Sequence, residues 1–151
     1  MSYQQFLPDE DATRVLGARL SALLAPGLVI FLEGDLGAGK TSFVRALIQA
    51  LGYEGRVKSP TYTLSELYKV SNMCLYHFDF YRFNDPREWI DAGLRECFDA
   101  ENVCLIEWPE RAEGLLPLPD LIIRLSHAES GRNIEIQANT EAGRKCLSQL
   151  I

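Results

Sequence analysis

A glycine-rich segment directly after an apolar run constrains the fold of this chain more than any other feature. Residues 34–41, GDLGAGKT, match G-x-x-x-x-G-K-[ST] and follow the apolar residues 28–32. Glycines permit the positive φ angles and the close backbone approach with which a loop surrounds phosphate groups. The pattern therefore predicts a buried strand, a phosphate-binding loop and a helix in succession, and with them an α/β fold.

The residues of this loop have separate expected tasks. Lys40 would contact the β- and γ-phosphate oxygens, Thr41 would offer its hydroxyl to Mg²⁺, and the helix would direct its positive end at the anion. The plain alternative is a turn with a solvated Lys40, but such a turn needs neither three glycines nor the Lys-Thr pair. The expected nucleotide-binding residues of the segment are Gly34, Asp35, Leu36, Gly37, Ala38, Gly39, Lys40, Thr41 and Ser42.

Length and composition favour one water-soluble domain. A chain of 151 residues with 47% hydrophobic and 24% charged residues can bury a core without disulfides or metals. The longest apolar run is too short to cross a bilayer, and the first ten residues lack the basic and apolar parts of a secretory signal. We expect a cytoplasmic protein with no membrane partner.

Charge and cysteine usage narrow the range of partners and cofactors. The net charge is −6 and no dense lysine or arginine cluster is present, so the chain is not expected to grip DNA or RNA unaided. If RNA is involved, another protein should hold it. The four cysteines contain no C-x-x-C pair and are interpreted as small buried hydrophobes rather than metal or redox groups: Cys74, Cys97, Cys104 and Cys146.

Hydrophobic periodicity places further elements along the whole chain. Helices are expected at residues 9–24, 41–51, 84–90 and 140–151, and strands at 28–32, 61–70, 74–81, 103–106, 121–125 and 134–138. No repeat or linker is visible. We predict a single domain over residues 1–151, a three-layer P-loop NTPase-like α/β fold whose mixed sheet has a parallel centre and antiparallel hairpins.

Two carboxylates are candidates for completing a nucleotide site. Glu107 ends the unbroken apolar run from residue 103, which is typical of a central parallel strand, and we assign it to Mg²⁺ and to catalysis. Asp79 lies in an alternating, half-buried strand and is interpreted as a hairpin or edge residue that could position water or the γ-phosphate. A solvated strand end for Glu107 and a turn carboxylate for Asp79 are the alternatives.

Other polar residues leave more than one interpretation open. Residues 59–63, SPTYT, could form a switch that senses the γ-phosphate or simply begin a strand with exposed threonines. Trp108 could be a packing residue or face a partner, and His77 is interpreted as an ordinary strand histidine. Three arginines could reach a phosphate or lie on the surface: Arg82, Arg111 and Arg132.

Four motifs in a fixed order resemble one known family. They are GDLGAGKT at residues 34–41, VKSPTYTL at 57–64, YHFDFYR at 76–82 and IEWPE at 106–110. Together they resemble the bacterial TsaE (YjeE) family over about residues 9 to 138, and four ordered motifs are far more specific than the loop alone. Ser42, where a second threonine is common, and Phe80, where leucine is usual, are slight departures.

This resemblance implies a function. It suggests a Mg²⁺-dependent ATPase needed for threonylcarbamoyladenosine formation in tRNA beside the anticodon. The protein would act on a TsaD and TsaB complex and meet tRNA only through these partners. By position, Lys40 and Thr41 would bind ATP or ADP and Mg²⁺, Glu107 would be the second metal contact, and Asp79 a catalytic candidate. The resemblance also places Trp108 beside the nucleotide and suggests nucleotide contacts from Glu10 and Arg132.

Rival functions differ in features that the sequence can be searched for. A small-molecule P-loop kinase is the alternative enzyme, but it needs a mobile lid bearing arginines, and no arginine-dense lid segment is found. A GTPase switch would carry an N-K-x-D motif, which does not occur. A purely structural interaction protein would not bind ADP.

Overall fold

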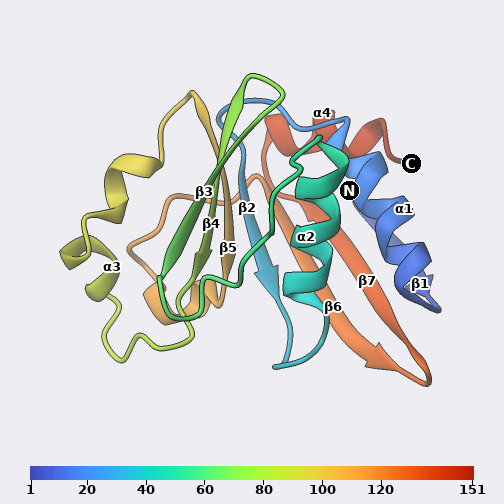
Figure 1. The fold of residues 1–151 in the computed structure, drawn as a ribbon, viewed down its shortest axis with the longest axis horizontal. Coiled ribbons are helices and arrows are strands. Elements are labelled where there is room, and N and C mark those ends of the chain that lie inside the picture. The colour runs from blue at the N-terminus through green and yellow to red at the C-terminus, as the bar shows by residue number, and fades with distance from the viewer.

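The chain forms a seven-stranded mixed sheet with helices packed against it (Figure 1). The structure is a computed structural model that describes all of residues 1–151. Its elements, in chain order, are β1 (Ser2–Leu7), α1 (Glu10–Ser21), β2 (Val29–Glu33), α2 (Lys40–Ala50), β3 (Ser65–Val70), β4 (Met73–Asp79), α3 (Glu88–Asp91), η1 (Leu94–Cys97), β5 (Asn102–Glu107), η2 (Pro109–Ala112), β6 (Leu121–Ala128), β7 (Gly131–Ala138) and α4 (Glu141–Ser148).

The strand order is β1-β7-β6-β2-β5-β4-β3, with a parallel centre as predicted. β2 pairs in parallel with β5 and β6, and β5 pairs in parallel with β4. The β3–β4 and β6–β7 hairpins are antiparallel. β1 was not predicted, because its sequence SYQQFL lacks the β-branched residues typical of a strand; pairing with β7 holds it in the sheet.

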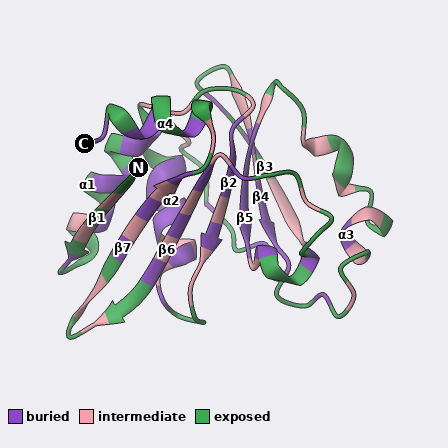
Figure 2. Ribbon diagram, turned by 180° about the vertical axis from the view of Figure 1, so that it is seen from behind, coloured by how far each residue is buried: buried purple, intermediate pink, exposed green.

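The two faces of the sheet are covered to different extents. On one face a cluster of 26 buried hydrophobic residues lies between the sheet and α1, α2 and α4. On the other, the segment with α3, η1 and η2 covers a smaller cluster of eight buried residues over β2, β5 and β4. The rear of β1, β7 and β6 has no helix over it, so the third layer is only half complete (Figure 2).

The first hairpin differs from its predicted bounds at both ends. Residues 61–64 form a turn instead of a strand: the Leu64 N–H donates to the Pro60 carbonyl at 2.8 Å, and Leu64 has φ 70°. β4 stops at Asp79 rather than Tyr81: the Phe80 N–H still donates to the Glu107 carbonyl of β5, but the chain then turns, and the Phe83 N–H donates to the Phe80 carbonyl. The turn at residues 61–64 leaves residues 59–63 free of the sheet and close to its carboxyl-terminal edge.

The cysteines agree with the interpretation as uncharged packing residues. All four are free thiols, with Cys104 and Cys146 buried and Cys74 and Cys97 half-buried. Burial raises the pKa of the Cys104 thiol to about 12, so this group stays protonated at neutral pH.

Candidate functional site

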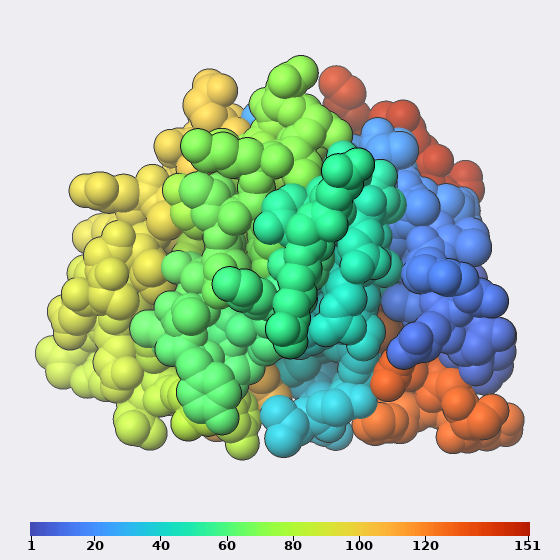
Figure 3. All heavy atoms as spheres, in the orientation of Figure 1, coloured from blue at the N-terminus to red at the C-terminus, as the bar shows by residue number.

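The glycine-rich segment is a loop between β2 and α2 at the carboxyl ends of the parallel strands, where α/β folds bind their ligands. Figure 3 shows it at the lower edge of the molecule, beside the β6–β7 hairpin. Gly34 has φ 147°, and a Cβ atom there would overlap the Leu125 carbonyl oxygen. Gly39 has φ 105°, and a Cβ there would lie 2.7 Å from the Arg132 side chain. The loop path therefore requires glycine at both positions.

The start of α2 is left open for an anion. The long helices α1 and α4 have side-chain caps, from Asp9 to the Ala12 N–H and from Thr140 to the Gly143 N–H. α2 begins after Gly39, with no side-chain cap and no acidic residue in its first turn. Its first N–H groups and its positive dipole end thus remain available, as in a phosphate site.

Every buried lysine, histidine, aspartate and glutamate of this chain gathers around this helix start. Lys40, His77, Asp79 and Glu107 expose at most 5% of their surface. Burial of charged groups is unfavourable unless they are paired or have a ligand to bind. Such a cluster, in a fold whose other buried residues carry no charge, indicates a functional site.

Lys40, the predicted phosphate contact, points back over the loop. Its Nζ donates to the Gly34 carbonyl at 2.7 Å and lies 3.6 Å from the centre of the Trp108 ring. Burial lowers the pKa of the Lys40 ammonium group, an effect that the nearby Glu107 carboxylate opposes. Trp108 is half-buried, has φ 58° and contacts Tyr81, so it is an aromatic wall of the site rather than a residue of the core.

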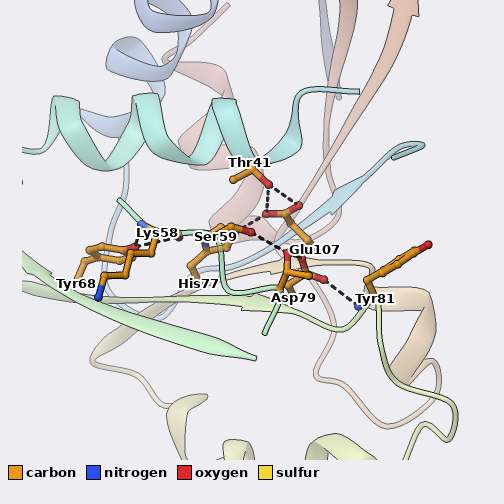
Figure 4. A network of polar contacts seen from close by, with 9 residues as sticks. Thr41, Lys58, Ser59, Tyr68, His77, Asp79, Tyr81 and Glu107 are labelled. Atoms are coloured by element: carbon orange, nitrogen blue, oxygen red, sulfur yellow. Dashed lines mark hydrogen bonds and ion pairs between the residues drawn. The ribbon is translucent and has the colours of Figure 1, made fainter. Parts of the chain in front are cut away.

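Thr41 and Glu107, the two predicted metal contacts, meet directly (Figure 4). The Thr41 hydroxyl lies 3.1 Å from Oε1 and 3.0 Å from Oε2 of Glu107. Glu107 is the last residue of β5 and is buried, which excludes the alternative of a solvated strand end. A hydroxyl and a carboxylate are the hard oxygen ligands that suit Mg²⁺.

Asp79 lies beside Glu107, because β4 and β5 are parallel neighbours in register. Its carboxylate accepts hydrogen bonds from the Thr61 hydroxyl at 3.1 Å and from the Tyr81 N–H at 2.9 Å. Burial raises the pKa of the Asp79 carboxyl; these hydrogen bonds oppose the rise and the nearby Glu107 adds to it. Asp79 is a hairpin residue, as one of the two predicted alternatives stated, but it is not on an edge strand, since β4 lies between β3 and β5.

The segment 59–63 contacts the site through Thr61. Ser59 and Thr61 share a hydrogen bond of 2.8 Å between their hydroxyls, and Thr61 also reaches Asp79. Tyr62 points outward, 82% exposed, with the Arg82 guanidinium 4.4 Å from its ring centre. The segment is therefore in contact with a candidate catalytic group while its aromatic side chain faces solvent.

The two remaining predicted residues, Glu10 and Arg132, line one cavity on the other side of the loop. This cavity has a volume of about 290 Å³. A second one, of about 100 Å³, is lined by Glu10 and Ser42 between α1 and α2. The structure thus places all the sequence-predicted residues around one end of the sheet.

His77 was interpreted from the sequence as an ordinary strand histidine; it does lie on a strand, but its contact with Glu107 was not predicted. Its Nε2 atom lies 2.6 Å from Glu107 Oε2, and the ring is completely buried. Strand alternation predicted His77 and Asp79 on the same side of β4, which was the available signal. The sequence did not show that Glu107 lies next to this face of β4.

One prediction concerns the unfavourable burial of Asp79. Replacing Asp79 by asparagine is expected to raise the free energy of unfolding near neutral pH by roughly 0.5–2 kcal/mol. Because the folded-state pKa of Asp79 is raised, protonation favours the folded protein below the unfolded pKa of about 3.8, and this contribution is lost as pH rises through the folded pKa. The advantage of the variant should therefore be largest at neutral pH and vanish toward about pH 4.

Urea unfolding across this pH range measures the effect, with Asp91→Asn on the exposed side of α3 as the control with the same charge change. An advantage that grows on acidification would contradict the prediction.

Comparisons with known proteins agree with the site. The family model described as "Threonylcarbamoyl adenosine biosynthesis protein TsaE" matches residues 7–134. A Haemophilus influenzae protein named tRNA threonylcarbamoyladenosine biosynthesis protein TsaE is 40% identical over 152 residues, covering 97% of this chain and 96% of its own length. The Bacillus subtilis protein of the same name is 41% identical over 118 residues, 78% of this chain and 73% of its own.

A solved structure also resembles the fold. The crystal structure of Bacillus subtilis YdiB superposes with a TM-score of 0.82 at 32% identity, covering 99% of this chain and 94% of that one. No helix of the present structure has both the length and the apolarity that crossing a bilayer requires. Since the matched region contains the loop, both carboxylates and Trp108, the chain belongs to the TsaE family of tRNA threonylcarbamoyladenosine biosynthesis proteins.

Proposed function

We propose that this protein binds and slowly hydrolyses ATP in the presence of Mg²⁺, and that it acts on a TsaB and TsaD complex during threonylcarbamoyladenosine formation in tRNA. One observation carries the proposal: a glycine loop and an uncapped helix start adjoin a cluster of buried charged side chains. The loop and the helix start would bind phosphate, and a catalytic role would explain why charged side chains are buried beside them.

The residues at the loop fit a nucleotide with its metal. Lys40 would leave the Gly34 carbonyl for phosphate oxygens, and the first N–H groups of α2 would bind the same phosphates. Thr41 and Glu107 would hold Mg²⁺, since their oxygens already converge within 3.1 Å. When bound, Mg²⁺ would neutralise part of the negative charge on the phosphate oxygens.

Asp79 and its neighbours would orient the attacking water. The carboxylate is buried beside Glu107, and its raised pKa brings it closer to the range in which a carboxylate can accept a proton. Hydrogen bonds from Thr61 and Tyr81 hold it in place. Because Thr61 belongs to the segment 59–63, a change in that segment would alter the catalytic group directly.

An incomplete site would account for the slow turnover that we propose for the isolated chain. In phosphate-loop enzymes a correctly placed arginine accelerates hydrolysis by roughly 10³- to 10⁵-fold. Here the guanidinium groups of Arg82 and Arg111 lie over the rings of Tyr62 and Tyr81. Docking of the partner complex would order residues 59–63 and complete the site, so that the ATP state favours association and hydrolysis resets the complex.

ATP turnover, measured with and without TsaB, TsaD and tRNA, tests this proposal. We expect the complete mixture to be faster than the isolated chain by at least about tenfold, or ~1.4 kcal/mol of barrier. TsaB and TsaD with tRNA but without this chain provide the background rate. Equal rates with and without partners would contradict the coupling. Phosphoryl transfer to a metabolite in place of phosphate release would favour the kinase alternative.

A further inference from the structure

We propose that His77 is a positioning residue, which fixes the Glu107 carboxylate in the orientation needed for Mg²⁺ binding. The inference rests on the proposed function and extends it to a residue outside the predicted nucleotide site. His77 lies on β4, and Glu107 lies on the neighbouring strand β5. The His77 ring is completely buried. The only hydrogen bond of the His77 side chain joins Nε2 to Glu107 Oε2, at 2.6 Å.

The direction of this hydrogen bond follows from its two partners. A carboxylate oxygen only accepts hydrogen bonds, so Nε2 carries the hydrogen and donates it. The second ring nitrogen, Nδ1, is buried and has no hydrogen-bond partner. A bare Nδ1 leaves one acceptor unsatisfied, whereas a hydrogen there would bury an unpaired donor, so the geometry favours an imidazole with its hydrogen on Nε2.

The hydrogen bond acts on the oxygen that also faces the loop. Oε2 of Glu107 contacts both His77 and the Thr41 hydroxyl, whereas Oε1 contacts Thr41 alone. The main chain of Glu107 is held from the same side, since its carbonyl accepts the Phe80 N–H at 3.1 Å. β4 thus restrains both the carboxylate and the main chain of Glu107. The Oε1 atom remains directed at Thr41, the other residue proposed to bind Mg²⁺. Hydrogen bonds of this kind to a metal-binding group usually set its orientation and basicity.

A packing role does not explain this residue. The same face of β4 carries the completely buried Leu75 two residues earlier, so the local core accepts an aliphatic side chain. An aliphatic residue at position 77 would avoid the unsatisfied Nδ1 atom. What it would lose is the donor to Glu107, which would then keep a buried carboxylate with Thr41 as its remaining side-chain partner.

Three substitutions of His77 distinguish its role as a hydrogen-bond donor from its contribution to packing. His77→Leu removes the donor. His77→Gln can place an amide N–H near the position of Nε2, whereas His77→Asn carries the same amide one methylene too short. Leu75→Val, on the same face, is the control for a small loss of core packing. Urea unfolding of each variant first establishes that it is folded.

The measurement is the affinity for ADP with excess Mg²⁺ and again with EDTA, together with direct Mn²⁺ binding followed by electron paramagnetic resonance. We expect His77→Leu and His77→Asn to weaken Mn²⁺ binding in the presence of ADP by roughly tenfold or more. The gain in ADP affinity due to Mg²⁺ should shrink in parallel, while ADP affinity in EDTA stays unchanged. His77→Gln and Leu75→Val should stay near the wild-type values.

Two results would overturn the inference. One is unchanged metal binding in His77→Leu, and the other is His77→Gln behaving like His77→Asn. If His77→Leu does not fold, the comparison between glutamine and asparagine decides. Failure of the proposed function has a different signature, because wild-type protein would then show no Mg²⁺-dependent binding of ADP at all.

Discussion

Glu107→Gln is expected to reduce partner-stimulated ATP turnover by roughly 10²- to 10³-fold, the usual loss when a group that stabilises charge in a transition state is removed. The carboxylate is buried at the end of β5 and contacts the hydroxyl of Thr41. Glutamine retains the size of the side chain but not its charge, so the proposed Mg²⁺ ion would lose the one anionic protein ligand that we assign to it. Binding of ADP should weaken much less than turnover, because the loop and Lys40 remain.

Steady-state phosphate release and an ADP titration on the same variant measure the two effects separately. Glu113→Gln, an exposed residue after η2, is the control with the same charge change and should behave as wild type. Small and equal effects of Glu107→Gln on turnover and on binding would remove Glu107 from the site.

Lys40→Ala is expected to weaken ATP and ADP binding by roughly 10- to 100-fold, the size of a lost charge-assisted hydrogen bond. Lys40 is 4% exposed, and its ammonium group contacts one carbonyl and the Trp108 ring, so it is already at the loop before a phosphate arrives. Urea unfolding of the variant separates a loss of nucleotide affinity from any loss of stability.

A titration monitored by tryptophan fluorescence follows nucleotide binding through Trp108 at the site, above the constant contribution expected from the buried Trp89. Calorimetry provides a second readout that does not depend on either ring. Lys145→Ala on α4, at the opposite end of the molecule, is the matched control (Figure 1). Unchanged nucleotide affinity in Lys40→Ala would argue against the phosphate-binding role of the loop.

Local patterns were sufficient for the elements around the loop. The apolar run before Gly34 is β2, and the helical spacing after Thr41 is α2. The unbroken run from Val103 is a central parallel strand ending at Glu107, as predicted. These segments form as expected because burial on both faces, or along one helical stripe, leaves a periodic signal in the chain itself.

Other features have no such local signal. β1 contains no β-branched residue, and pairing with β7, more than 100 residues away along the chain, holds it in the sheet. The turn at residues 61–64 replaces a predicted strand, because hydrogen bonds from Leu64 and Asp79 hold it beside the hairpin. The half-open third layer was likewise not visible, since it depends on where the segment with α3 folds back.

The sequence by itself determined the glycine-rich loop between a strand and a helix, the α/β class and the family, because these depend on residues close together in the chain. Only the tertiary structure decided which carboxylates meet. Asp79 is an interior residue beside Glu107, and His77 is the donor to that carboxylate, because β4 pairs in parallel with β5. Strand order and register are set by the packing of the whole sheet, so no local pattern in β4 could have shown what lies across from it.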